Sequence, residues 1–262
     1  MTNNWWAKAY DKMKDLEYDY HYIDFSTAKQ EVEFIEEVLN LSKGAEILDL
    51  GCGNGRHSIL LAQKGYKVRA LDYSAQILAQ AKREANRREV KVDFIKGDMR
   101  EIGDKGKYDG IIVLDGSFGI FSDKENEELI KRVSASLKVG GRLLIQSFNP
   151  YYIANNQSIS YENEGDKTFI RETRFDPYSG KVVDKISLLN NNGEKKEEIP
   201  TRYYRAYTLP ELDKMFAKAN LGTMEVYGHN ESYTPKVDES FNVREHTVFY
   251  TVVQKVKINI YP

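Results

Sequence analysis

The feature that most constrains the fold of this chain is a glycine-rich loop that directly follows a short apolar run. Residues 47–50 read Ile-Leu-Asp-Leu, a composition typical of a buried strand, and residues 51–55 read Gly-Cys-Gly-Asn-Gly. Glycine tolerates positive φ angles, and without a Cβ it lets a ligand approach the backbone closely. A loop of this kind between a strand and a helix is the context of a nucleotide-type binding site. The sequence therefore predicts a bound ligand at this turn.

Helix-like and strand-like segments alternate around the loop. An amphipathic helix over 26–40, with Thr27 and Gln30 at capping-box spacing, precedes it. Beyond it we expect helices over 56–64, from Ser74 and from Asp123, and strands over 67–72, 92–96, 110–114 and 142–148, the last one introduced by a turn at residues 140–141. This alternation predicts right-handed βαβ crossovers and therefore an α/β fold with a mostly parallel sheet.

The pattern changes after Pro150. Strands expected over 168–175, 182–189 and 202–207 are separated by turn-forming residues and predict a small antiparallel β insert. A helix from Thr208, with Glu211 at capping-box spacing, and an antiparallel pair of strands over 223–227 and 246–255 would then complete the main sheet. We therefore expect a ligand-binding core over 1–150, the insert over 151–207 and the completing helix and strands over 208–262.

The spacing of the loop favours a ligand other than a dinucleotide. It is G-x-G-x-G, whereas the dinucleotide fingerprint is G-x-G-x-x-G, which places a pyrophosphate at a helix N-terminus. Asp49 precedes the first glycine, and its carboxylate would repel a pyrophosphate. The same carboxylate suits a cofactor that carries an ammonium and a sulfonium group.

Two further acids follow neighbouring strands. Asp72 ends the second strand, where a carboxylate can accept hydrogen bonds from both hydroxyls of a ribose, although an Asp at a strand end is also a common helix cap. Asp98 and Met99 follow the third strand and can contact an adenine, or can simply be a polar strand end with a packed methionine. The order in which the loop, Asp72 and Asp98 follow one another along the chain indicates a cofactor site more specifically than any one of them alone.

Residues 46–148 resemble the core of the class I, Rossmann-like S-adenosylmethionine-dependent methyltransferases. The matching stretches are residues 47–55, 70–74 (Ala-Leu-Asp-Tyr-Ser), 96–100 (Lys-Gly-Asp-Met-Arg), 108–113 (Tyr-Asp-Gly-Ile-Ile-Val) and 137–141 (Leu-Lys-Val-Gly-Gly). The resemblance implies a seven-stranded sheet with one antiparallel strand and S-adenosyl-L-methionine as the cofactor.

The resemblance also implies roles for individual residues. Asp49 and the loop would hold the methionine portion of the cofactor, Asp72 the ribose, and Asp98 with Met99 the adenine, while Leu114 would border the transferred methyl. The expected cofactor-binding residues are Asp49, Gly51, Cys52, Gly53, Asn54, Arg56, Asp72, Tyr73, Asp98, Met99 and Leu114.

The aromatic N-terminus and the β insert are similar in layout to small-molecule N-methyltransferases, among them amino-sugar N,N-dimethyltransferases. Residues 114–119 would then form the active-site wall and the insert would cap the acceptor. The N-terminal aromatic residues form either a lid over the site or a patch packed on the sheet edge. The Arg and Tyr side chains that alternate over 202–207 either protect an edge strand or form an acceptor-facing wall that pairs with an anionic group.

No single catalytic base stands out. An amine acceptor must be neutral and an oxygen acceptor must lose its proton, and His21, Tyr22 and Ser117 are the candidates for assisting. The string Asn-Pro-Tyr-Tyr at 149–152 is similar to the Asn-Pro-Pro-Tyr motif of nucleic-acid amino methyltransferases. That motif follows the fourth strand, whereas this string follows the fifth, so we give it little weight.

Charge and composition limit the partners. The formal net charge of −2 offers no excess of positive charge for nucleic acid, and the single cysteine excludes internal disulfides and Cys-rich metal sites. No apolar run is long enough to span a bilayer, and the N-terminus lacks the pattern of a signal peptide. We expect a cytoplasmic monomer or homodimer without a metal that methylates a small molecule, most simply at nitrogen. The alternatives are a tRNA or protein acceptor, a non-catalytic nucleotide binder, or an NAD-dependent reductase.

Overall fold

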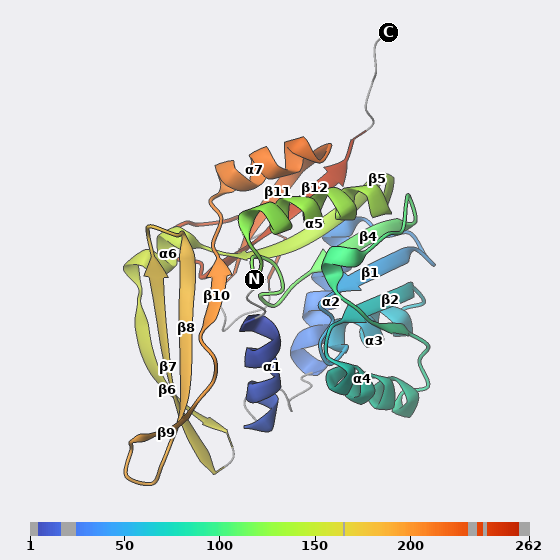
Figure 1. Ribbon diagram of the computed structural model, residues 1–262. Coiled ribbons are helices and arrows are strands. Elements are labelled where there is room, and N and C mark those ends of the chain that lie inside the picture. The colour runs from blue at the N-terminus through green and yellow to red at the C-terminus, as the bar shows by residue number, and fades with distance from the viewer. Residues whose placement is uncertain (1–4, 17–24, 165, 230–234, 238–239, 257–262) are drawn as a thin grey trace.

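The computed structural model describes residues 5–16, 25–164, 166–229, 235–237 and 240–256. Its main sheet has seven strands in the order β11-β12-β5-β4-β1-β2-β3 (Figure 1). Their bounds are Glu46–Leu50 (β1), Lys67–Asp72 (β2), Asp93–Lys96 (β3), Tyr108–Val113 (β4), Leu137–Phe148 (β5), Leu221–His229 (β11) and Val248–Lys255 (β12). Only β12 runs antiparallel to its neighbours in this sheet. The predicted Rossmann-like fold is therefore confirmed.

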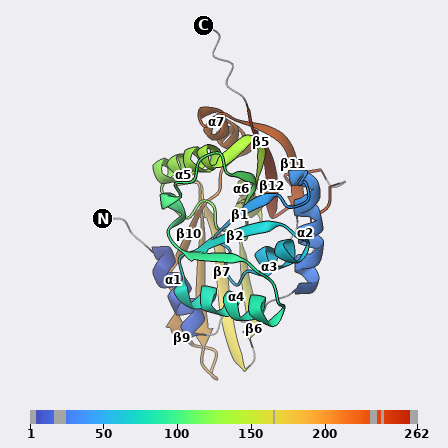
Figure 2. The ribbon, with the colours of Figure 1, turned by 90° about the vertical axis from the view of Figure 1, so that its right-hand side faces the viewer.

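Helices cover both faces of the main sheet. Three of them, α2 (Phe25–Leu39), α3 (Arg56–Gln63) and α4 (Ala75–Arg87), pack through their apolar stripes on one face. On the other face lie α5 (Asp123–Ser136) and α7 (Leu209–Lys218). Figure 2 shows α2 and α5 on opposite sides of the strands. None of the helices in the described part of the chain is long and apolar enough to cross a membrane.

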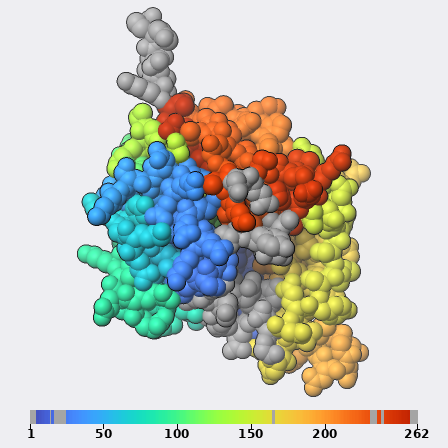
Figure 3. All heavy atoms as spheres, turned by 180° about the vertical axis from the view of Figure 1, so that it is seen from behind, coloured from blue at the N-terminus to red at the C-terminus, as the bar shows by residue number. Residues whose placement is uncertain are grey.

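Seen from behind, α2 and the C-terminal strands lie side by side on the surface of the molecule (Figure 3). The ring of Phe34 on α2 meets Tyr227 of β11 and Tyr250 of β12 edge-on, with centroid separations of 5.3 and 5.4 Å. Such aromatic pairs add to the burial of apolar area. Segments from the two ends of the chain thus close one end of the sheet together.

The insert is a second, antiparallel sheet in the order β10-β8-β7-β6, with β9 paired to β8. Its strands are Ser158–Glu164 (β6), Lys167–Asp176 (β7), Lys181–Leu189 (β8), Lys195–Glu198 (β9) and Arg202–Arg205 (β10). A short helix, α6 (Pro150–Asn155), joins it to β5. The N-terminal helix α1 (Trp5–Asp15) lies between the insert and the main sheet (Figure 1). Its Ala9 and Met13 pack against Phe169 and Ile186 of the insert.

The sequence pattern was wrong at several boundaries and did not predict some of the elements. Thr27 cannot cap α2, because that helix already begins at Phe25. The expected turn at Gly140 lies inside β5, where the strand continues through a residue with φ of +82° as a bulge opposite β4. The strand expected over 202–207 ends at Arg205, two residues early, where the chain turns toward the segment after β4 and the amide of Arg205 donates to Gly119 O. Helices α1 and α6 and strands β6 and β9 had not been assigned.

Candidate active site

A cavity of about 530 Å³ opens at the carboxyl ends of β1, β2 and β4. The strand order reverses between β1 and β4, and in open α/β sheets ligands bind at such a switch point. All eleven residues expected to bind the cofactor line this cavity, namely Asp49, Gly51, Cys52, Gly53, Asn54, Arg56, Asp72, Tyr73, Asp98, Met99 and Leu114. The structure therefore brings together, in one place, side chains from four strand ends.

The glycine loop is shaped by close contact with the segment after β4. Gly51 has φ of +78°, and a Cβ placed on it would lie 2.4 Å from Oγ of Ser117. The amides of Gly51 and Cys52 both donate to Leu71 O, which ties the loop to β2. At Gly53, by contrast, a Cβ would meet nothing within 4 Å, because this residue faces open space. The loop is thus held from behind and open toward the cavity.

Asp49 lies beneath the loop and is only 3% exposed. Its Oδ2 accepts a hydrogen bond of 2.6 Å from Oγ of Ser58, a fully buried residue of α3. Burial raises the pKa of Asp49 to about 6, although His57 and the Ser58 bond act in the opposite direction. A carboxylate in this position would be stabilised by a cation in the cavity.

Asp72 is oriented by two backbone amides. Its Oδ2 accepts from Gly53 N at 2.9 Å, and its Oδ1 accepts from Ser74 N at 2.8 Å, at the start of α4. Burial raises the pKa of Asp72, while these backbone donors lower it. Each carboxylate oxygen has a second lone pair, so both can still accept a hydrogen bond from a ligand. Next to it, Tyr73 is half exposed and packs edge-on against Trp6 at 4.6 Å.

Asp98 is engaged with its neighbour Arg100. The Arg100 guanidinium contacts both carboxylate oxygens, the shortest bond being 2.6 Å, and Arg100 N donates to Oδ1 at 2.9 Å. Burial acts to raise the pKa of Asp98, but the Arg100 bonds hold it below its usual value. Arg100 also stacks over Phe121 at 4.4 Å. The contact of Asp98 with adenine stays a prediction, and it would have to be shared with this ion pair.

Arg56, the residue after the loop, points at protein carboxylates. Its guanidinium lies 2.8 Å from Asp115 and 3.0 Å from Glu31 of α2, and His57 lies 2.7 Å from the same Glu31. Burial acts to raise the pKa of Asp115, but the Arg56 charge holds it below its usual value. Asp115 has φ of +53°, and its amide donates to Gln146 Oε1 at 2.6 Å. This network fixes the chain just after Leu114.

Helix α1, from the aromatic segment expected to form either a lid or a patch on the sheet edge, forms a wall of the cavity. Trp6 and Tyr10 line the cavity. On its other side Trp5 meets Tyr203 and Tyr204 of β10 edge-on, at 5.9 and 5.7 Å. The signal was present in the sequence, because the buried residues Trp6, Ala9, Met13 and Leu16 recur at helical spacing.

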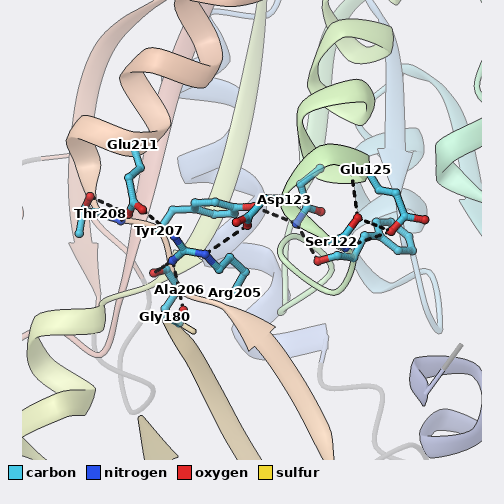
Figure 4. A network of polar contacts seen from close by, with 11 residues as sticks. Ser122, Asp123, Glu125, Gly180, Arg205, Ala206, Tyr207, Thr208 and Glu211 are labelled. Carbon is cyan, nitrogen blue, oxygen red and sulfur yellow. Dashed lines mark hydrogen bonds and ion pairs between the residues drawn. The ribbon is translucent and has the colours of Figure 1, made fainter. Parts of the chain in front are cut away.

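The alternating Arg and Tyr residues of the insert divide into two groups. Arg202 and Tyr204 line the cavity, opposite the glycine loop. Arg205 and Tyr207 lie away from it, in the network drawn in Figure 4. Arg205 donates to Gly180 O, Ala206 O and Glu211, and Tyr207 donates to Asp123 of α5 at 2.8 Å. This second group joins the insert to α5 and α7.

Of the three candidates for assisting catalysis, the structure describes the position of one. Ser117 lines the cavity, and its Oγ donates to Gly51 O at 3.4 Å. His21 and Tyr22 lie outside the described residues. Within the described ranges, no group of three or more His, Cys, Asp or Glu side chains is arranged to hold a metal ion.

Asn149, which begins the string that is similar to a nucleic-acid methyltransferase motif, is a structural residue. It is fully buried, and its amide donates to Val243 O and His246 O at 2.9 and 2.8 Å. Its Oδ1 accepts from Tyr151 N and caps α6. Both ends of the side chain are therefore used, and it is not part of the cavity lining.

Comparison with known proteins finds a methyltransferase domain in this chain. A family model described as a methyltransferase domain matches residues 47–141, the segment that carries the cavity's glycine loop and acids. An S-adenosylmethionine-dependent methyltransferase from Clostridium acetobutylicum has the same fold, with a TM-score of 0.72, 21% identity and coverage of 97% of this chain and 99% of that one. The chain is an S-adenosylmethionine-dependent methyltransferase with a Rossmann-like fold. S-adenosylmethionine is its cofactor.

Two further proteins place this methyltransferase among its relatives. The putative methyltransferase YqeM of Bacillus subtilis is 29% identical over 181 residues, which are 67% of this chain and 73% of YqeM. Other curated relatives are matched over about half of their length. The sugar N-methyltransferase KedS8 from a Streptoalloteichus species has a TM-score of 0.62, 18% identity and 93% coverage of both chains. The match to KedS8 extends over 93% of this chain and so includes the β insert. The two proteins are therefore similar in layout as well as in the core.

Proposed function

We propose that this methyltransferase transfers a methyl group to the nitrogen of a small-molecule acceptor. The observation that carries the proposal is the position of α1 and β10, whose side chains Trp6, Tyr10, Arg202 and Tyr204 bound the cavity across from the glycine loop. A volume of about 530 Å³ lies in the range of small-molecule pockets. Walls built of buried aromatic side chains favour a compact acceptor over a macromolecule.

We infer that the cofactor occupies the half of the cavity next to the main sheet. Asp49 and the loop would hold the methionine portion, Asp72 the ribose, and Asp98 with Met99 the adenine. The charges support this arrangement, because the carboxylates of Asp49 and Asp72 suit a ligand with an ammonium and a sulfonium group. Bound there, S-adenosylmethionine supplies an electrophilic methyl group near Leu114. The protein's part is then to orient the acceptor and exclude water.

The state of the acidic and imidazole groups supports nitrogen as the target. An oxygen acceptor needs a base, whereas an amine needs only its neutral form. Among the described lining residues, every carboxylate or imidazole except the exposed Asp11 already has a partner: Asp49 with Ser58, His57 with Glu31, Asp72 with Gly53 and Ser74, Asp98 with Arg100, and Asp115 with Arg56. Burial also raises the pKa of Tyr204, which keeps its hydroxyl protonated. The sugar N-methyltransferase with the same layout is further support.

The direct test is a screen for S-adenosylhomocysteine production. The protein and S-adenosylmethionine are incubated with a panel of small amines, with the hydroxyl analogue of each amine, and with bulk tRNA and a protein mixture. We expect turnover with members of the amine panel. Turnover confined to hydroxyl compounds would overturn the assignment to nitrogen, and turnover confined to tRNA or protein would overturn the small-molecule acceptor. Asp72→Ala, which should lose cofactor affinity, is the control for background hydrolysis.

A further inference from the structure

Arg202 is a buried cation on the acceptor side of the cavity. The residue is 7% exposed and lines the cavity from β10. Its Nη2 bonds Asp184 at 2.5 Å, and its Nη1 has a sulfur contact, Met13 Sδ, at 3.4 Å. Its buried Nε has no hydrogen-bond partner among the described residues. A buried donor without a partner costs free energy, so such a group in a native structure calls for an explanation, for example a bound water or ion.

The counter-ion of Arg202 is shared. Asp184 is 2% exposed and also accepts two bonds of 3.1 Å from Arg171 of β7, so that one carboxylate serves two guanidinium groups. Arg171 is partly exposed to water and lies 3.8 Å from Glu162. Arg202, by contrast, is shielded from water and has no second carboxylate nearby among the described residues. Arg202 therefore has a single carboxylate partner in the described part of the chain, and it shares that partner with Arg171.

The two ends of the cavity differ in charge. The end at the glycine loop contains the buried acid Asp49 and the partly buried acid Asp72. Arg56 also lines the cavity, but Glu31 and Asp115 neutralise it. At the insert end, Arg202 lies beside the protonated hydroxyl of Tyr204, a second hydrogen-bond donor. The insert end of the cavity thus offers a cation and a hydroxyl donor, whereas the loop end offers carboxylates; the exposed Asp11 of α1 also lines the cavity.

We propose that Arg202 binds an anionic oxygen group, a carboxylate or a phosphate, on the methyl acceptor. The planar guanidinium suits both groups, because it presents its donors in a fixed fork. The inference rests on the proposed function, and it narrows the acceptor to an amine that also carries a negative charge. Anchoring that charge at β10 would leave the amine directed toward Leu114, where the methyl group is expected. Arg202 is then a specificity-determining residue for the acceptor.

The two tryptophans of the chain, Trp5 and Trp6, provide a readout that does not depend on turnover. Trp6 lines the cavity, and Trp5 packs on Tyr204. The protein saturated with S-adenosylhomocysteine is titrated at constant ionic strength with acetate, with methyl phosphate and with neutral acetamide, while tryptophan fluorescence is recorded. We expect a saturable change with acetate or methyl phosphate and none with acetamide. The stronger of the two anions identifies the acceptor's group.

Two variants assign the anion site to this side chain. Arg202→Lys keeps a charge for Asp184 but removes the Nε donor and the fork, and it should weaken anion binding by about tenfold or more. Arg171 is the other partner of Asp184 and does not line the cavity. The Arg171→Lys variant should therefore bind the anion with wild-type affinity. Unchanged S-adenosylhomocysteine affinity shows that both variants are folded.

Either of two results would overturn the proposal: equal responses of the wild-type protein to acetate and acetamide, or wild-type anion affinity in Arg202→Lys. The wild-type comparison decides the matter even if Arg202→Lys does not fold. Methylation of uncharged amines together with no anion response would remove this inference and leave the proposed function standing. Anion binding without methylation of any amine would remove the proposed function and leave the anion site at Arg202 standing.

Discussion

The backbone amide of Gly53 donates a hydrogen bond of 2.9 Å to Oδ2 of Asp72, which ties the middle of the glycine loop to the end of β2. The other carboxylate oxygen accepts from Ser74 N at 2.8 Å. One side chain therefore positions the loop and the start of α4, and at the same time presents its remaining lone pairs to the cavity. The shape of the glycine loop and the proposed ligand contact therefore depend on the same carboxylate.

Asp72→Ala should weaken the binding of S-adenosylhomocysteine by about tenfold or more, because hydrogen bonds to a charged group are lost together with the order of the loop. Isothermal calorimetry measures the affinity. The matched control is Asp93→Ala, which removes an exposed β3 carboxylate paired with Arg69 outside the cavity. Wild-type affinity in Asp72→Ala would show that the ribose lies elsewhere.

Asp49→Asn should stabilise the ligand-free protein at neutral pH and weaken cofactor binding. The pKa of Asp49 is raised from 3.8 to about 6, chiefly by burial, so the folded state binds the proton more tightly than the unfolded state. The stability from this group is fully present below pH 3.8 and is lost as the pH rises through 6. The ionised group then costs up to about 3 kcal/mol at pH 7.

Denaturant unfolding at pH 4 and pH 7.5 checks this pH dependence. The gain in the free energy of unfolding of Asp49→Asn over wild type should be larger at pH 7.5 than at pH 4. An equal gain at both values would mean that Asp49 titrates normally in the folded protein. Weaker S-adenosylhomocysteine binding by the stabilised variant would identify the buried charge as a functional one.

Gly51→Ala should destabilise the protein more than Gly44→Ala does. The two glycines have φ of +78° and +76°, so both substitutions carry the same left-handed strain, about 1–2 kcal/mol. A Cβ at Gly44 meets nothing within 4 Å, whereas one at Gly51 clashes with Ser117. The difference between the two free energies of unfolding isolates the clash. In the double variant, Ser117→Gly should recover part of the free energy of unfolding that the clash costs. Additive effects of the two substitutions on the free energy of unfolding would contradict the close contact.

Arg205→Met should loosen the joint between the insert and the main sheet. The side chain is 13% exposed and contacts Gly180, Ala206, Asp123 and Glu211, so its loss should cost about 1–3 kcal/mol. Arg174→Met, at a side chain that is 62% exposed, should change stability by less than about 0.5 kcal/mol. Hydrogen exchange should be faster in β8 and β10 of Arg205→Met alone. Equal protection in the two variants would show that other contacts hold the insert.

Much of the core could be predicted from the sequence because its determinants are local. The glycine spacing, the acids near the ends of β1 and β2, and the capping box at Thr208 each depend on residues a few positions apart. Parallel strands then bring their carboxyl ends to one edge, so that Asp49 and Asp72 line one cavity although they are separated in sequence.

The acceptor side was less predictable because it depends on tertiary contacts. Period-2 alternation places Arg202 and Tyr204 on one face of a strand, but it does not say which face meets the cavity. That is decided by α1, which packs against β10 through Trp5, and by the end of the strand at Arg205. Asp98 could be recognised from its motif, but the sequence did not show that Arg100 forms an ion pair with it.

The central claim, that the glycine loop and its acids bind S-adenosylmethionine, is tested most directly by calorimetry of the purified protein with S-adenosylhomocysteine and, separately, with NADH. The account predicts saturable binding of S-adenosylhomocysteine at one site per chain and no binding of NADH at the same concentrations. Tight binding of NADH without binding of S-adenosylhomocysteine would contradict it.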